Sequence, residues 1–289
     1  MLPAEALGVR PESTEPLSTR TVLYLGMATP ARHAGQTCIY CLGDSKSARG
    51  AAHAFPEAVF PVGPTLPAGG VCDGCNQYAG RKLEATLISY PLVALALQLM
   101  RLPGKRGTVR QRIGVYELST DDRGGVTFPI EPPEFGMDAD GVSTAKIAIH
   151  PQIDPKFDMD RFRRALYHIA FNLAAANLDL AHALRPEYDP IRKYVKAPDK
   201  GERWPFVEVT QQLTNFVPGV GAHRLEFPGA ELVKLRIFNT EYFVDLINSG
   251  RLLTVQFENN DGRAKLIGPD WTIPRPRQDP GRLYRATIR

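Results

Sequence analysis

The chain has 289 residues, 43% of them hydrophobic, and its formal net charge is +4. This length and composition predict a globular protein with one large domain or two ordinary ones, and the mild positive charge permits a nucleic-acid partner without requiring one. The first 20 residues lack the apolar core of a signal peptide, and no stretch approaches the roughly 18 apolar residues of a membrane span. We therefore expect a soluble, cytoplasmic protein with no membrane partner.

The first 35 residues are expected to form a loose N-terminal arm. They begin with a stretch rich in proline, serine, threonine and glutamate, a composition that disfavours a packed core. A short apolar segment, TVLYLGM at 21–27, predicts a strand. The first domain is therefore placed after residue 35.

All four cysteines of the chain fall into two C-x2-C pairs with 30 residues between them. Each C-x2-C turn directs both of its sulfurs at one metal, so this spacing predicts a tetrahedral structural zinc site. Disulfides or a redox-active pair are the alternatives. The predicted ligands are Cys38, Cys41, Cys72 and Cys75.

The cysteine module, which we define as residues 36–110, is expected to depend on this metal for its folding. TCIYCLGD predicts a first metal-binding turn, and VCDGCNQYAGRKLE predicts a second turn that runs into a helix. The helical pattern continues from about residue 81 to residue 102 with Pro91 inside it, which predicts one kinked helix or two consecutive helices. Such a small module buries little apolar surface, so metal binding would contribute folding free energy directly.

Residues 111–289 predict a second domain of mixed helices and antiparallel strands, which makes the expected fold class α+β. Residues 158–184 are the clearest predicted helix, because apolar residues recur there every three or four positions and Pro186 follows. YDPIRKYVK predicts a shorter helix. Predicted strands are RIGVYELST, GVTFPIE, TAKIAIH, FVEVTQQL, ELVKLRIF, EYFVDLI and RLLTVQFE.

The longest predicted helix also has a polar side. This side carries Arg161, Arg164, His168, Asn172 and Asp179. Charged and polar residues on one face of an amphipathic helix usually face water. We therefore expect this side to be solvated.

The order of motifs in the cysteine module is C-x2-C, then His-x-Phe-Pro beginning at His53, then C-x2-C followed by Asn76 and Gly80. Over roughly residues 36–102 this order resembles the HNH endonuclease superfamily, in its subgroup with four zinc-binding cysteines. The resemblance implies that the module is a ββα-metal, or treble-clef, zinc finger. It also implies metal-dependent hydrolysis of DNA phosphodiester bonds.

The resemblance assigns roles to two residues outside the cysteines. His53 would be the general base that activates a water, a task that suits an imidazole because this group changes protonation near neutral pH. Asn76 would help to hold a catalytic divalent ion, Mg²⁺ or Mn²⁺, which would stabilise the charge on the phosphate. The alternatives are that His53 only packs beside Pro56 and that Asn76 is a helix N-cap.

Two departures from the family pattern weigh against catalysis. Ala52 stands directly before His53, where the family often has an acidic or histidine metal ligand, and the stretch FPVGPTLPAGG contains no asparagine at the family's middle position. Magnesium prefers hard oxygen ligands, and the module offers few of them. Our second hypothesis is therefore a catalytically degenerate zinc module that binds nucleic acid or protein.

Basic residues in and after the module predict DNA as the partner. If the module docks its helix against a duplex, as the resemblance implies, these side chains would neutralise phosphates without determining sequence preference. The alternative is a solvated basic face. The predicted nucleic-acid-binding residues are Arg81, Lys82, Lys105 and Arg106. A third hypothesis assigns the activity to residues 111–289, in which we find no nucleotide-binding loop, nucleophile elbow or paired carboxylates.

Overall fold

The structure is a computed structural model. It describes residues 9–10, 22–23, 36–50, 52–60, 63–99, 110–113, 116–120, 126–127, 134–137, 143–149, 156–178, 180–210, 220–227, 229–254, 256–257, 264–269 and 284–288. Helices and antiparallel sheets occur together in the described residues, so the predicted α+β class is confirmed.

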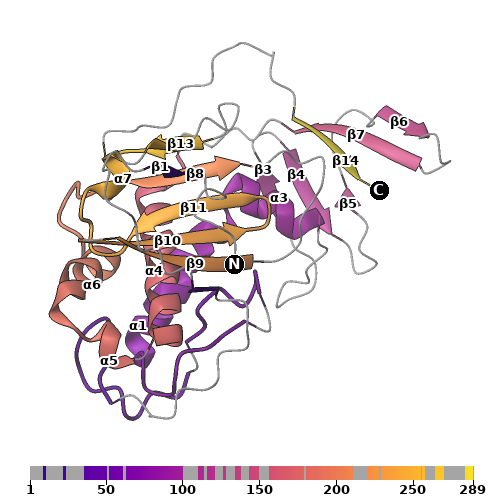
Figure 1. Cartoon of the computed structure of the whole chain (residues 1–289). Coiled ribbons are helices and arrows are strands. Elements are labelled where there is room, and N and C mark those ends of the chain that lie inside the picture. The colour runs from indigo at the N-terminus through magenta and orange to yellow at the C-terminus, as the bar shows by residue number, and fades with distance from the viewer. Residues whose placement is uncertain are drawn as a thin grey trace.

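The largest sheet has six strands in the order β13-β8-β11-β10-β9-β2, and each neighbouring pair is antiparallel. Short hairpin connections between β9, β10 and β11 place the middle of the sheet in chain order, as antiparallel pairing allows. Its strands are β2 (Val22–Leu23), β8 (Phe206–Thr210), β9 (Val220–Phe227), β10 (Ala230–Ile237), β11 (Thr240–Asp245) and β13 (Ala264–Ile267). Figure 1 shows β13, β8, β11, β10 and β9 lying side by side in this order.

The longest helix, α4 (Met159–Leu178), packs across one face of this sheet against β9, β10 and β11 (Figure 1). Its apolar residues Phe162, Leu166, Ile169 and Leu173 are buried, as the sequence pattern predicts, and Ala176 is partly buried. A short helix, α5 (Leu180–Ala183), follows it. The helix predicted over 158–184 is therefore confirmed, with residue 179 outside the described residues.

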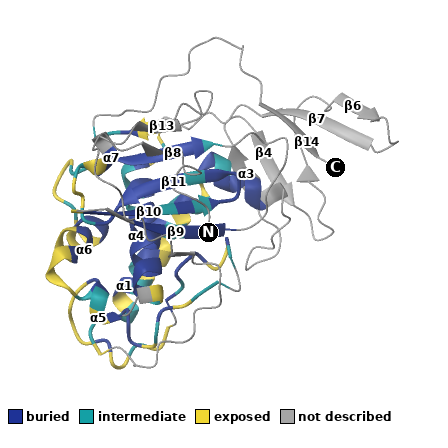
Figure 2. Cartoon of the chain, in the orientation of Figure 1, coloured by how far each residue is buried: buried dark blue, intermediate teal, exposed yellow. Residues whose placement is uncertain are grey.

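The solvated side predicted for α4 is wrong for two of its residues. His168 is 4% exposed and Asn172 is 1% exposed. The cysteine module covers this side of α4, so the helix is buried along most of its length (Figure 2). Arg161 and Arg164 are half-buried, and Asp179 lies outside the described residues.

The helical part of the cysteine module runs without a gap through α1 (Asp73–Tyr78), a π-helical segment η2 (Ala79–Glu84) and α2 (Ala85–Ile88). A new helix, α3 (Pro91–Leu99), begins at the proline, whose missing N–H is tolerated at the first helical position. The prediction of two consecutive helices around Pro91 is confirmed. Both η2 and α2 contact α4.

The hydrophobic core is continuous between the cysteine module and the C-terminal half. One buried cluster extends in sequence from Cys38 to Ile267 and includes side chains from the module, from α4 and from the large sheet. The boundary predicted at residue 110 stays a prediction, because residues 100–109 lie outside the described residues.

The remaining elements are short. They are β1 (Val9–Arg10), β3 (Arg110–Ile113), β4 (Tyr116–Thr120), β5 (Val126–Thr127), β6 (Glu134–Met137), β7 (Ser143–Ile149), η3 (Pro186–Tyr188), α6 (Asp189–Lys196), α7 (Arg251–Thr254), β12 (Gln256–Phe257) and β14 (Tyr284–Ile288). The helix predicted from YDPIRKYVK is confirmed as α6. The strand predicted from RLLTVQFE is wrong over its first four residues, which form α7, and β9 was not predicted.

Candidate metal centre and the residues around His53

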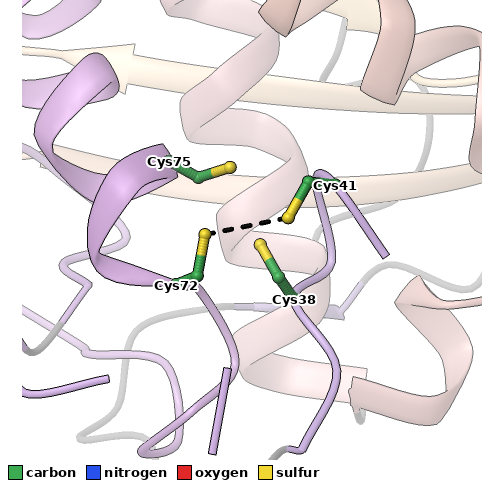
Figure 3. Close-up of side chains that lie close together, drawn as sticks. All are labelled: Cys38, Cys41, Cys72 and Cys75. Atoms are coloured by element: carbon green, nitrogen blue, oxygen red, sulfur yellow. Dashed lines mark hydrogen bonds between the residues drawn. The ribbon is translucent and has the colours of Figure 1, made fainter. Parts of the chain in front are cut away.

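The four cysteine side chains converge on a common centre (Figure 3). All four sulfurs lie within 4.8 Å of one another, and Cys41 Sγ lies 3.7 Å from Cys72 Sγ. Four thiolates at about 2.3 Å from one zinc ion would stand about 3.8 Å apart, so the donor set and its size suit a metal ion such as zinc. All four cysteines are free, which does not agree with the alternative of two disulfides.

Backbone hydrogen bonds shape the first C-x2-C turn and join it to the second. Within the turn, Leu42 N donates to Cys38 O at 2.9 Å, and Cys38 N donates to Gly43 O at 2.9 Å. Ile39 N donates to Gly70 O at 2.9 Å, just before the second pair. Cys72 is the N-cap of α1 and Cys75 lies in its first turn. A loop and a helix start therefore bring the two sulfur pairs together.

The cysteine thiols of the cluster differ in pKa. A hydrogen bond with Cys75 lowers the pKa of Cys38 to about 4, and the same interaction raises the pKa of Cys75. A thiol with so low a pKa is a thiolate at neutral pH, and the thiolate is the form that binds metals. Burial raises the pKa of Cys41, and the pKa of Cys75 is raised as well, so these two thiols would release their protons on binding a metal.

A buried arginine from the C-terminal half supports the first cysteine turn. Arg192 of α6 donates from Nε to the carbonyl oxygen of Ile39 at 2.8 Å. Its guanidinium also donates to the carbonyl oxygens of Ala183 and Arg185 and pairs with Asp189. Sequence analysis did not identify this residue, because Arg192 lies in a basic segment that looks like an exposed helix.

His53 lies in a short antiparallel pairing between residues 52–54 and 64–66. It pairs with Thr65, and two backbone hydrogen bonds of 2.8 Å flank the pair, from Ala54 N to Pro64 O and from Leu66 N to Ala52 O. The imidazole is half-buried, and its Nδ1 is buried without a hydrogen-bond partner among the described residues. His168 and His223 also have a buried Nδ1 without a partner among the described residues, so this feature by itself does not single out His53.

Ala52 is 6% exposed and belongs to the hydrophobic core. Its neighbour Ala54 is buried as well, so the two alanines flank the half-buried His53. A carboxylate at position 52 would have to leave water for this apolar environment, which costs several kcal/mol unless the charge is paired. The packing therefore gives a physical reason for alanine at this position.

Asn76 lies inside α1, and the N-cap of that helix is Cys72, so the N-cap alternative for Asn76 is wrong. A Cβ on Gly50 would come within 3.0 Å of Asn76 Nδ2, which places this amide beside the segment that leads to His53. Asp73 Oδ1 accepts hydrogen bonds from the backbone of the same segment, at 3.0 Å from Arg49 N and 3.1 Å from Gly50 N. The start of α1 therefore contacts the approach to His53.

Two of the predicted nucleic-acid-binding residues are described. Arg81 and Lys82 are exposed and adjacent on the π-helical segment η2. Lys105 and Arg106 lie outside the described residues. Both interpretations of the basic residues, phosphate contact and solvated face, are compatible with this exposure.

Sequence analysis also missed a buried polar network between α4 and the cysteine module. Tyr40, between Cys38 and Cys41, donates its hydroxyl to Asn172 Oδ1 at 2.6 Å. Asn172 Nδ2 lies 3.1 Å from the carbonyl oxygen of His53 and 3.1 Å from His168 Nε2. The i, i+4 spacing of His168 and Asn172 was visible in the sequence, but no pattern indicated what would cover them.

Burial lowers the pKa of His168 to about 4, from an ordinary value of 6.5. The unfolded chain then binds more protons than the folded one between pH 6.5 and 4, so stability is complete above pH 6.5 and falls as the pH drops through this window. We expect His168 to account for about 2 kcal/mol of the decrease in unfolding free energy between pH 7 and pH 5.

Urea unfolding of the wild type and of His168→Gln at these two pH values measures this contribution. The glutamine oxygen can accept the hydrogen bond from Asn172, but the side chain does not titrate. The variant should therefore show a smaller loss of stability on acidification. An equal loss in both proteins would contradict the assignment.

In comparisons with protein-family models, curated proteins and solved structures, the chain matched none of them. Within the described part of the chain, no helix has both the length and the apolar character needed to cross a membrane.

Proposed function

We propose that this protein is an HNH-type endonuclease that hydrolyses DNA phosphodiester bonds with His53 as general base. The observation that carries the proposal is the order of elements around His53. The segment with His53 pairs with residues 64–66, and α1 follows in the chain. The first cysteine pair precedes these two segments, and the second pair lies at the start of α1. Two paired β-segments and a helix are the parts of a ββα-metal finger, with His53 on the first segment as the family resemblance implies.

In the proposed hydrolysis, His53 would remove a proton from a water molecule. The water oxygen would attack phosphorus, and the bond to the 3′ oxygen would break. Because Nδ1 is buried, Nε2 is the nitrogen that would take the proton from the water. For Nε2 to accept a proton, the ring must carry its hydrogen on Nδ1. We therefore assign the role of proton acceptor to Nε2.

Two metal ions have different roles in this proposal. A structural Zn²⁺ would be held by Cys38, Cys41, Cys72 and Cys75. A catalytic Mg²⁺ or Mn²⁺ would supply Lewis-acid stabilisation of the phosphate charge when bound. Asn76 is the residue of this chain that would hold it, because an amide oxygen is a hard ligand and the Asn76 side chain lies beside Gly50, three residues before His53. The remaining ligands would be oxygens of the substrate phosphate and water.

The second candidate is a catalytically degenerate zinc module that binds nucleic acid. The observation in its favour is the buried Ala52, which removes the ligand that often precedes the general base. This candidate predicts DNA binding that weakens with salt, as phosphate contacts do, and no cleavage. Arg81 and Lys82 would contribute to either function.

Cleavage of supercoiled plasmid in Mg²⁺ or Mn²⁺ tests the proposal. We expect the wild type to nick the plasmid and His53→Ala to be slower by at least about 100-fold, the usual contribution of a general base. His182→Ala, which changes a half-buried histidine of α5, is the matched control and should retain activity.

Zinc content and thermal unfolding of both variants show whether the fold is kept. Equal cleavage by the wild type and a folded His53→Ala variant would exclude His53 as the base. Salt-dependent DNA binding by a wild type that does not cleave would favour the degenerate module.

A further inference from the structure

The backbone of His53 is held from two sides. Within the short pairing, Ala52 O and Ala54 N face residues 64–66. Since successive peptide groups of an extended segment point in opposite directions, His53 O faces away from this pairing. That oxygen accepts a hydrogen bond from Asn172 Nδ2, which comes from α4, 119 residues further along the chain.

Chemistry fixes the orientation of the Asn172 amide. A carbonyl oxygen can only accept, so the group facing His53 O must be the NH₂ and the group facing Tyr40 must be the amide oxygen. The same NH₂ faces His168 Nε2, which must therefore accept with its lone pair. The amide thus uses both of its N–H groups and its oxygen.

These groups lie in a water-excluded position. Tyr40, His168 and Asn172 are all buried, so each hydrogen bond acts at low dielectric and cannot be replaced by solvent. Because Tyr40 lies between two of the metal-binding cysteines, one amide connects the first cysteine turn, the His53 backbone and α4. The position of His53 relative to the metal cluster therefore depends on a helix outside the cysteine module.

We propose that Asn172 is a positioning residue for His53. From its place on α4, the Asn172 amide holds the backbone carbonyl of His53, the proposed general base. Catalysis by the cysteine module would therefore require the C-terminal half of the chain. The catalytic part of this inference rests on the proposed nuclease function. A displacement of about 1 Å in a reacting group can reduce a rate by about 100-fold, whereas binding of the substrate backbone elsewhere is unaffected.

Three variants separate positioning from folding. Asn172→Leu removes the amide at similar volume, and Tyr40→Phe keeps the ring but removes the hydroxyl that orients the amide. Asn177→Ala is the control, since Asn177 is an exposed asparagine of the same helix whose side chain donates to Leu173 O, at 2.8 Å, within α4. Zinc content, plasmid cleavage kinetics, and hydrogen exchange at the amides of Ala54 and Leu66 are measured for each.

We expect Asn172→Leu to retain zinc, to lower kcat by about 10- to 100-fold with KM nearly unchanged, and to exchange faster at Ala54 and Leu66. Tyr40→Phe should show the same changes in weaker form. Wild-type kcat together with wild-type exchange in a folded Asn172→Leu protein would overturn the proposal. If Asn172→Leu does not fold, kcat and hydrogen exchange of Tyr40→Phe test the proposal instead.

The exchange measurement keeps this proposal distinct from the nuclease proposal. A wild type that does not cleave would refute the proposed function. Faster exchange at Ala54 and Leu66 in Asn172→Leu would still support the positioning of His53 by Asn172, and unchanged exchange would overturn it.

Discussion

Replacing Cys38 with serine is expected to abolish stoichiometric zinc binding and to unfold the cysteine module. Structural zinc in small modules supplies about 10 kcal/mol or more of apparent folding free energy, while whole domains have about 5–15 kcal/mol in total. Cys38 is also completely buried and belongs to the continuous core. Loss of the metal should therefore lower the melting temperature of the protein as a whole.

Metal analysis and thermal unfolding measure this effect, and a strong zinc chelator added to the wild type should reproduce it. Ser47→Ala is the matched control, because it changes an exposed side chain a few residues after the first cysteine turn. A Cys38→Ser protein with the wild-type zinc content and melting temperature would refute the metal centre.

Replacing Arg192 with alanine is expected to destabilise the protein by roughly 2–4 kcal/mol, because buried carbonyl oxygens lose a charged donor. The Arg192 side chain is 4% exposed and donates to the carbonyl oxygens of Ile39, Ala183 and Arg185. Without the guanidinium the oxygens of Ile39 and Ala183 lose this donor, whereas Arg185 O keeps its bond from Tyr188 N. Each unsatisfied group costs about 1–3 kcal/mol. Arg192→Lys should not restore stability, since an ammonium lacks the fork of donors.

Urea unfolding of Arg192→Ala beside Lys193→Ala tests this prediction. Lys193 is the next residue of α6, but its ion pair with Asp199 is solvent-exposed. Its removal should leave stability nearly unchanged, because exposed pairs contribute little. We also expect faster zinc loss from Arg192→Ala, since the arginine holds the backbone of the first cysteine turn. Equal unfolding midpoints for the two variants would contradict the role of Arg192.

Arg192 and Asn172 together indicate that the cysteine module is not an independent finger. Arg192 contacts the backbone between the first two cysteines, and Asn172 contacts the backbone of His53. Both come from helices that follow the module by many residues. The continuous core gives the same result on a larger scale, because module side chains and α4 bury each other.

Local sequence patterns predicted the parts of the structure that depend on neighbouring residues. The C-x2-C spacing brings the sulfurs of each pair together through a tight turn, and the apolar period of α4 gives it a buried side. Pro91 begins a helix because of its missing N–H. These features need only a few consecutive residues, so the sequence by itself determined them.

Only the tertiary structure decided what the polar side of α4 faces. His168 and Asn172 have the pattern of a solvated face, yet the cysteine module covers them and uses their hydrogen-bonding groups. The same holds for Arg192, for the location of Asn76 beside Gly50, and for the buried Ala52 before His53. Burial depends on surfaces from distant parts of the chain, and hydrophobic periodicity within one element carries no information about a polar partner from another.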